Sequence, residues 1–174
     1  GLDHILDGLR IGDNVVWAVD AVEDYRDFVG PYIEAAKREG RKIVYFRFAD
    51  HPPLLEDEAG ILRHDLNAYR GFESVTSSVY RSITDHGVGT FYLFDCLSDL
   101  LSAWATDQMV GNFFRVICPY LFRLDTIPYF AVLRAHHSFG TIARIRETTQ
   151  VMIGVYSHDG RRHVHPIKVW QRHS

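Results

Sequence analysis

The sequence predicts an α/β fold: a three-layer sandwich around a mostly parallel sheet that ends in a β-hairpin. Short apolar runs of β-branched and aromatic residues alternate with segments of helical periodicity, which is typical of strands linked by helices. The last two apolar runs are separated only by the turn at residues 157–160, which predicts a hairpin. A length of 174 residues fits one domain with one core.

The first half of the chain is expected to supply two buried strands and two helices. Residues 14–19 form an apolar run typical of a strand that is buried on both faces. Apolar residues at helical spacing predict a helix over 22–39, with a kink or restart at Pro31. A second strand is expected at 42–48 and a second helix at 72–86.

The second half of the chain completes the alternation of strands and helices. In order, it predicts a strand at 90–95, a helical region at 97–122 interrupted near Gly111 and Pro119, a strand at 127–133, a helix at 138–148, and hairpin strands at 151–156 and 163–170. This order places several strand ends at one edge of a parallel sheet, where α/β proteins bind their ligands.

Composition excludes several classes of function. The net charge of −3 is too balanced to predict a polyanionic partner, so we expect neither nucleic acid nor a membrane surface as partner. No apolar stretch reaches the roughly 18 residues that span a bilayer. The two cysteines, Cys96 and Cys118, lie in apolar runs and not in a spaced framework. Reduced thiols and a cytoplasmic location are therefore expected.

The opening residues 1–13, G-L-D-H-I-L-D-G-L-R-I-G-D, resemble the start of KaiC-type domains of the RecA superfamily, which read G-L-D-x-I-L-x-G-G-L-x-x-G. Later features agree in order, with a strand that ends in Asp95 and a strand followed by His136 and His137. The resemblance implies that residues 1–174 form a single RecA/KaiC-like domain with a P-loop NTPase-like sheet.

Two further segments resemble a narrower group of proteins. Residues 94–107 (F-D-C-L-S-D-L-L-S-A-W-A-T-D) and 166–170 (P-I-K-V-W) are similar to the N-terminal region of proteins related to phosphoenolpyruvate synthase and pyruvate phosphate dikinase. This resemblance implies that the domain is part of a longer protein of that kind.

The phosphate-binding loop of the superfamily is expected at residues 19–26, and its chemistry is missing there. Such a loop needs glycines, a lysine for the terminal phosphates and a hydroxyl for magnesium. This segment has no glycine, Tyr25 stands where the lysine belongs, and Arg26 stands where the hydroxyl belongs. Three acids also approach the expected phosphate position: Asp20, Glu23 and Asp24. Alternatively, these acids simply favour the first turn of a helix.

The candidate ligand-binding residues are Arg26, Asp95, Asp99, His136 and His137. In an active relative, Asp95 and Asp99 would hold magnesium or its water, whereas the structural alternative is that Asp95 caps a helix or pairs with a basic group. Arg26 could meet a phosphate or be a surface charge. No catalytic residue and no metal site are assigned, because the histidines lack a completing set of ligands.

These observations predict a non-catalytic interaction or regulatory domain that needs no cofactor. Its expected partners are a second copy of itself, in a homo-oligomer, or a catalytic domain of the same protein. The alternative is an ATP-binding domain of a phosphotransferase, of the pyruvate, water dikinase or pyruvate phosphate dikinase type. That domain would bind ATP and magnesium through a non-standard site formed by Arg26, Asp95 and the region of His136.

Overall fold

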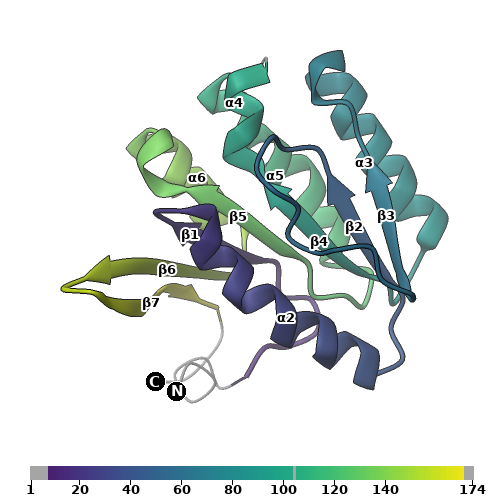
Figure 1. The fold of residues 1–174 in the computed structure, drawn as a ribbon. Coiled ribbons are helices and arrows are strands. Elements are labelled where there is room, and N and C mark those ends of the chain that lie inside the picture. Colours follow the sequence, from purple (N-terminus) through teal and green to yellow (C-terminus); the bar gives the residue numbers. More distant parts are fainter. Residues whose placement is uncertain (1–7, 104, 171–174) are drawn as a thin grey trace.

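A computed structural model describes residues 8–103 and 105–170, and it contains one seven-stranded sheet (Figure 1). The strand order is β3-β2-β4-β5-β1-β6-β7, and every neighbouring pair is parallel except β6 and β7. The strands are β1 (Val15–Val19), β2 (Ile43–Arg47), β3 (Ile61–Asp65), β4 (Phe91–Cys96), β5 (Tyr129–Leu133), β6 (Val151–His158) and β7 (Arg161–Val169).

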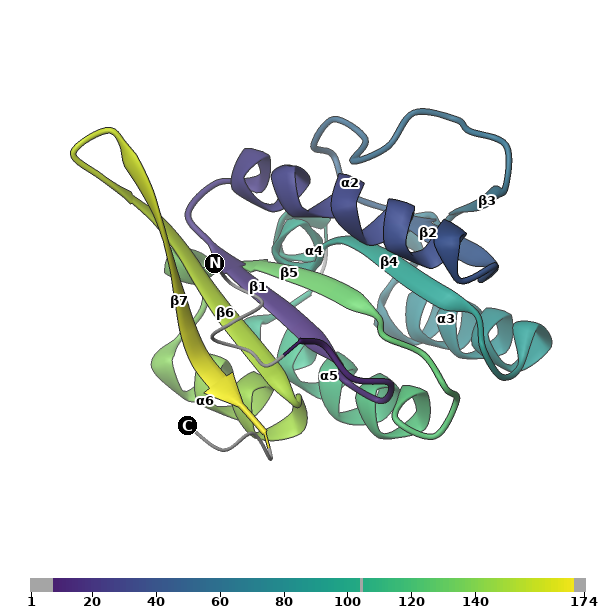
Figure 2. The same cartoon turned by 90° about the horizontal axis from the view of Figure 1, so that it is seen from below.

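Helices cover both faces of the sheet, which gives three layers (Figure 2). Helix α2 (Val22–Arg38) lies on one face, and α3 (Phe72–His86), α5 (Asp107–Leu121) and α6 (Phe139–Thr148) lie on the other. A single turn, α4 (Leu100–Ala103), precedes α5. The described residues also include three short 3-10 helices: Ala68–Arg70, Leu97–Asp99 and Arg134–His136.

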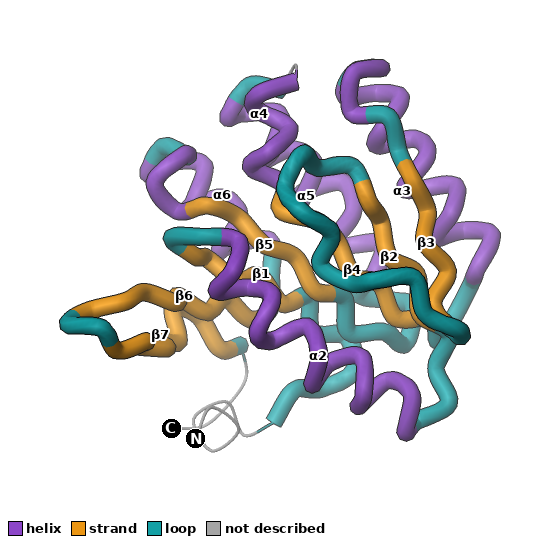
Figure 3. Tube along the Cα trace, in the orientation of Figure 1, coloured by secondary structure: helices purple, strands orange, loops and turns teal. Residues whose placement is uncertain are grey.

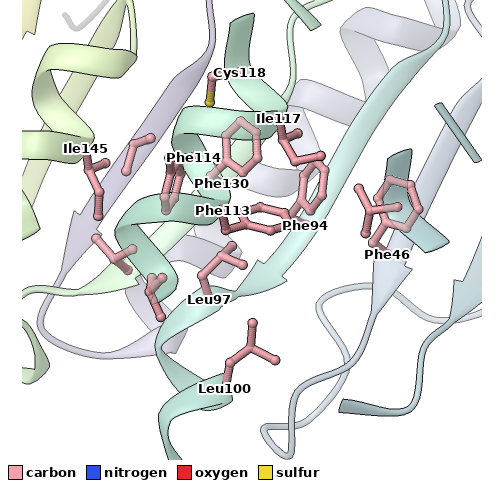
Figure 4. Close-up of a cluster of buried hydrophobic side chains, with 14 of the residues drawn as sticks. Phe46, Phe94, Leu97, Leu100, Phe113, Phe114, Ile117, Cys118, Phe130 and Ile145 are labelled. Carbon is pink, nitrogen blue, oxygen red and sulfur yellow. The ribbon is translucent and has the colours of Figure 1, made fainter. Parts of the chain in front are cut away.

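Alternation along the strands divides the core into two halves. In β1, Val15, Trp17 and Val19 pack on the side of α2, while Val16 and Ala18 pack on the opposite side. The second half-core is rich in phenylalanine, and Figure 4 shows rings from three strands and from α5 in contact there. Strands β1, β2, β4 and β5 are almost entirely buried, and β6 is buried over its first five residues. The sequence predicted a strand at each of these five places.

A long loop, residues 48–60, connects β2 to β3 and takes the place of a crossover helix (Figure 3). The loop passes over the same face of the sheet as α2, and its Leu54 is buried in the core on that face. A parallel connection needs about a dozen residues, and this loop supplies them without regular structure.

The structure corrects several sequence predictions. Strand β3 was not predicted. The helical region does not break near Gly111 and Pro119, since α5 passes through both; the break separates Ala103 from Asp107. The predicted restart at Pro31 is also wrong, because α2 continues through it. Residues 1–7, which carry most of the KaiC-like opening, and Trp104 lie outside the described residues.

Among the helices of the described part of the chain, none is both long and apolar enough to cross a bilayer.

Candidate functional site

The turn between β1 and α2, where the resemblance places a phosphate-binding loop, is very short. Only Asp20 and Ala21 separate the two elements, and Ala21 caps α2 without a side-chain hydrogen bond. Tyr25, at the position expected for the lysine, is fully buried under the sheet, and its hydroxyl donates to the carbonyl of Phe94 over 3.0 Å. The turn therefore presents neither a glycine-rich backbone nor a cationic side chain from this position.

The acidic side chains around this turn pair with arginines from neighbouring strands. Asp20 forms an ion pair at 2.6 Å with Arg134, the residue that directly follows β5. Arg162, on β7, contacts both Asp24 and Asp27 of α2. These ion pairs neutralise part of the negative charge and link α2 to the far end of the sheet.

Asp95 lies at the carboxyl end of β4 and is completely buried. Its carboxylate accepts four hydrogen bonds, from the Tyr45 hydroxyl, the Arg47 guanidinium at 2.9 Å, and the backbone N–H groups of Phe48 and Ala49 at 2.9 and 3.1 Å. Burial, and then the nearby Asp95 carboxylate, raise the pKa of Tyr45, which keeps its hydroxyl a donor. Four donors use the acceptor capacity of a carboxylate. Pairing with a basic group, the structural alternative for Asp95, is confirmed.

The loop anchored by Asp95 continues over the carboxyl end of β4. The backbone N–H of Cys96 donates to His51 Nε2 at 3.1 Å, so His51 carries its proton on Nδ1 and donates it to the Pro52 carbonyl at 2.8 Å. The backbone N–H of His51 donates to Asp99 at 3.2 Å. We call residues 48–54 the strap.

The strap also reaches α2 through Arg26. The Arg26 guanidinium donates to the carbonyls of Pro52 and Pro53, at 3.0 and 3.4 Å. Three of the five candidate residues, Arg26, Asp95 and Asp99, thus contact one strap. Each of these three side chains already forms hydrogen bonds with backbone groups of the strap.

His137 belongs to a second network. Its Nδ1 lies 2.7 Å from Asp107 and its Nε2 lies 2.6 Å from the Ser98 hydroxyl, in the order of a serine hydrolase triad. Ser98 is only 3% exposed, and its oxygen already accepts the N–H of Leu133 at 2.7 Å. This serine is closed to a substrate, so the network joins β4, β5 and the start of α5.

Hydrogen bonds set the charge of Asp107, and burial sets the charge of His137. Burial raises the pKa of Asp107, but hydrogen bonds from Ser138, Thr141 and His137 outweigh burial and lower this pKa to about 2. Burial lowers the pKa of His137, and the Asp107 carboxylate opposes that effect only in part. At neutral pH the pair is therefore an aspartate that accepts from a neutral imidazole.

His136 does not join His137. Its side chain is exposed and makes no hydrogen bond or ion pair within residues 8–103 and 105–170. The two histidines share no partner in the described residues: His137 bonds Ser98 and Asp107, whereas His136, at the end of the 3-10 turn Arg134–His136, bonds neither. Sequence reasoning missed the partners Tyr45, His51, Ser98 and Asp107, for which local sequence carries no signal.

Neither cysteine is poised as a nucleophile. Cys96 and Cys118 are both buried and free of any disulfide. Burial raises the pKa of the Cys96 thiol to about 12 and also raises that of Cys118. In the described ranges, no three side chains among His, Cys, Asp and Glu gather as metal ligands.

Comparison with known proteins identifies the fold. No protein-family model and no curated protein matches the chain. Among solved structures, it is similar to the flagellar accessory protein FlaH from Methanocaldococcus jannaschii, of RecA/KaiC-like fold, with a TM-score of 0.69. The chain has a RecA-like fold. The match covers 97% of this chain and 84% of FlaH at 11% identity, so the likeness extends to the architecture alone.

Proposed function

We propose that the chain is a non-catalytic RecA/KaiC-like interaction or regulatory domain whose phosphate-binding loop has been lost. The single observation that carries the proposal is that the hydrogen-bonding capacity of the Asp95 carboxylate is taken up by the chain itself. This acid, which would serve magnesium in an active relative, accepts four hydrogen bonds from the chain itself. A metal ion would have to displace these four donors and leave buried polar groups without their acceptor.

The turn between β1 and α2 supports the same proposal. A nucleotide triphosphate is held by successive backbone N–H groups in a glycine-rich loop, and two residues without glycine offer no such cradle. Asp20 and Asp24 already pair with Arg134 and Arg162, so these two arginines are engaged by the chain's own carboxylates. Glu23 adds a further negative charge at this point.

The strap supports the proposal from the opposite side. His51 and Pro52 lie between the end of β4 and Arg26 of α2, which is where an α/β sheet of this kind binds its ligand. Binding there would require the strap to leave, with loss of its bonds to Asp95, Asp99 and Arg26.

The proposal also covers the location of the domain, the protein to which it belongs and its partner. We place the domain in the cytoplasm, as part of a longer protein related to phosphoenolpyruvate synthase, where it docks onto a second copy or onto a catalytic domain. Segments 94–107 and 166–170, which resemble such proteins, support this context.

A thermal-shift titration with ATP and magnesium tests the proposal. A ligand at one hundred times its Kd stabilises by about 2.7 kcal/mol, which corresponds to roughly 5–10 °C for a domain of this size. We expect a shift below about 1 °C up to millimolar MgATP.

Matched variants decide what a positive shift would mean. Arg26→Ala removes a candidate ligand, and Arg38→Ala removes an exposed arginine at the other end of α2. A saturable rise that disappears in Arg26→Ala and persists in Arg38→Ala would establish the alternative, an ATP-binding domain of a phosphotransferase.

A further inference from the structure

Two adjoining hollows of about 430 and 290 Å³ lie between β3 and α3. They share His64, Asp65 and Ser78, so they form one continuous depression, which we call the β3–α3 groove. Figure 1 shows β3 at the outer edge of the sheet, beside α3. The groove lies at the opposite side of the sheet from the β6–β7 hairpin.

The backbone of β3 is open toward this edge. Leu66 donates its N–H to the Arg47 carbonyl of β2 at 2.9 Å. Because backbone groups alternate in direction along a strand, the N–H and C=O groups of Arg63 and Asp65 point away from β2. No other strand of the described residues pairs with β3 on that side.

An apolar side chain lies exposed beside the open backbone. Leu62 is 53% exposed, although its neighbour in register, Val44, is buried in the core on the α3 face. Leu62 therefore extends the apolar face of the sheet into the groove, where an added strand would cover it.

The groove carries an excess of positive charge. Three arginines (Arg63, Arg70 and Arg81) and two aspartates (Asp65 and Asp85) line it. Arg63 is paired with Asp65 at 2.9 Å, whereas the side chains of Arg70 and Arg81 make no hydrogen bond or ion pair within the described residues. The hydroxyl-bearing residues Ser74, Ser78 and Ser82, four residues apart on α3, add polar groups along the same wall.

We propose that the β3–α3 groove binds an extended acidic peptide of another protein, which adds as a strand beside β3. Its backbone would pair with Arg63 and Asp65, and its alternate side chains, roughly 7 Å apart, would enter the two hollows. A carboxylate in one hollow meets Arg81, and a carboxylate in the other meets Arg70. This inference rests on the proposed function and names the partner of that interaction domain.

A second copy of the chain fits the groove less well. The other edge strand of the sheet, β7, carries Arg161 and Lys168 besides the paired Arg162, so its charge has the same sign as the unpaired arginines of the groove. Pro166 also interrupts the ladder of β7.

Selection from a displayed library of random ten-residue peptides tests the proposal on the full chain. We expect enriched peptides to carry Asp or Glu at alternating positions, and synthetic copies to bind at least tenfold more weakly to Arg81→Glu. Arg115→Glu, which reverses an exposed charge on α5 outside the groove, should leave binding unchanged. No enrichment, enrichment without acids, or equal loss in both variants overturns the proposal.

A second pair of variants isolates the backbone. Arg63→Pro removes an outward N–H, whereas Arg63→Ala keeps it, so only the proline variant should lose the peptide. Thermal unfolding verifies that both variants fold, and amide exchange at Arg63 and Asp65 should slow when peptide binds the wild type. Unchanged exchange, or a dimer of the chain that occupies the groove, contradicts the proposal. The thermal-shift titration with MgATP does not involve the groove. A failure of the proposed function can therefore be distinguished from a failure of the peptide proposal.

Discussion

The carboxyl edge around Asp95 and the β3–α3 groove use their polar groups in opposite ways. Asp95 is fully buried and accepts four hydrogen bonds from the chain, while Arg70 and Arg81 in the groove have no side-chain partner in the described residues. The place where a RecA-like sheet would be expected to bind a ligand is thus satisfied internally. The groups that are available for a ligand lie at the edge of the sheet.

The largest difference between the two regions should appear in stability. Asp95→Ala leaves Arg47, the Tyr45 hydroxyl and two backbone N–H groups without their acceptor, so we expect a loss of about 3–5 kcal/mol in the free energy of unfolding. Asp85→Ala, at an exposed aspartate of the groove, should change it by less than about 0.5 kcal/mol. Urea unfolding at pH 7 measures both. A loss below 1 kcal/mol for Asp95→Ala would show that this acid is free for another role.

A smaller effect concerns the His137 network, and it depends on pH. The folded pKa of His137 lies below its ordinary value of 6.5, so the unfolded chain binds this proton more tightly. The free energy of unfolding therefore decreases as pH falls through about 6.5. The contribution of His137 to this decrease should be absent in His137→Gln.

The pH measurement compares the free energy of unfolding at pH 7.5 and pH 5.5 in both proteins. His136→Gln, which changes the exposed neighbouring histidine, is the matched control and should follow the wild type. If His137→Gln and His136→Gln behave alike, the buried neutral imidazole is not the cause.

The smallest effect is expected at the ion pair between Asp20 and Arg134. Both side chains are more than one third exposed, so Arg134→Ala should cost less than about 1 kcal/mol, and the cost should shrink in 0.5 M salt. Chemical unfolding at two salt concentrations checks this. A large, salt-independent loss would mean that this pair, and not Asp95, anchors the carboxyl edge.

The sequence predicts the central strands well because burial leaves a clear pattern. Residues 14–19 and 90–95 are continuous apolar runs, and both are inner strands. Strand β3 has no such pattern, since an edge strand is half solvated and Ile61–Asp65 includes three charged or ionisable side chains. The break before α5 had a signal, because Thr106 caps that helix by accepting from the N–H of Met109.

The site shows a different limit of sequence reasoning. Position along the strands correctly placed Asp95 at the carboxyl edge of the sheet. Its partners Tyr45 and Arg47 come from a strand about fifty residues earlier, and Phe48 and Ala49 come from the loop that follows this strand. Which donors meet a carboxylate depends on strand order and register, which local residue patterns do not encode.

The most direct test of the closed carboxyl edge is an NMR titration of the ¹⁵N-labelled chain with MgATP. If the chain's own groups saturate this edge, the backbone amides of residues 19–26 and 48–54 and of Asp95 will keep their shifts at millimolar MgATP. Saturable shifts concentrated in these residues would contradict the account, because they would show that a nucleotide displaces the strap.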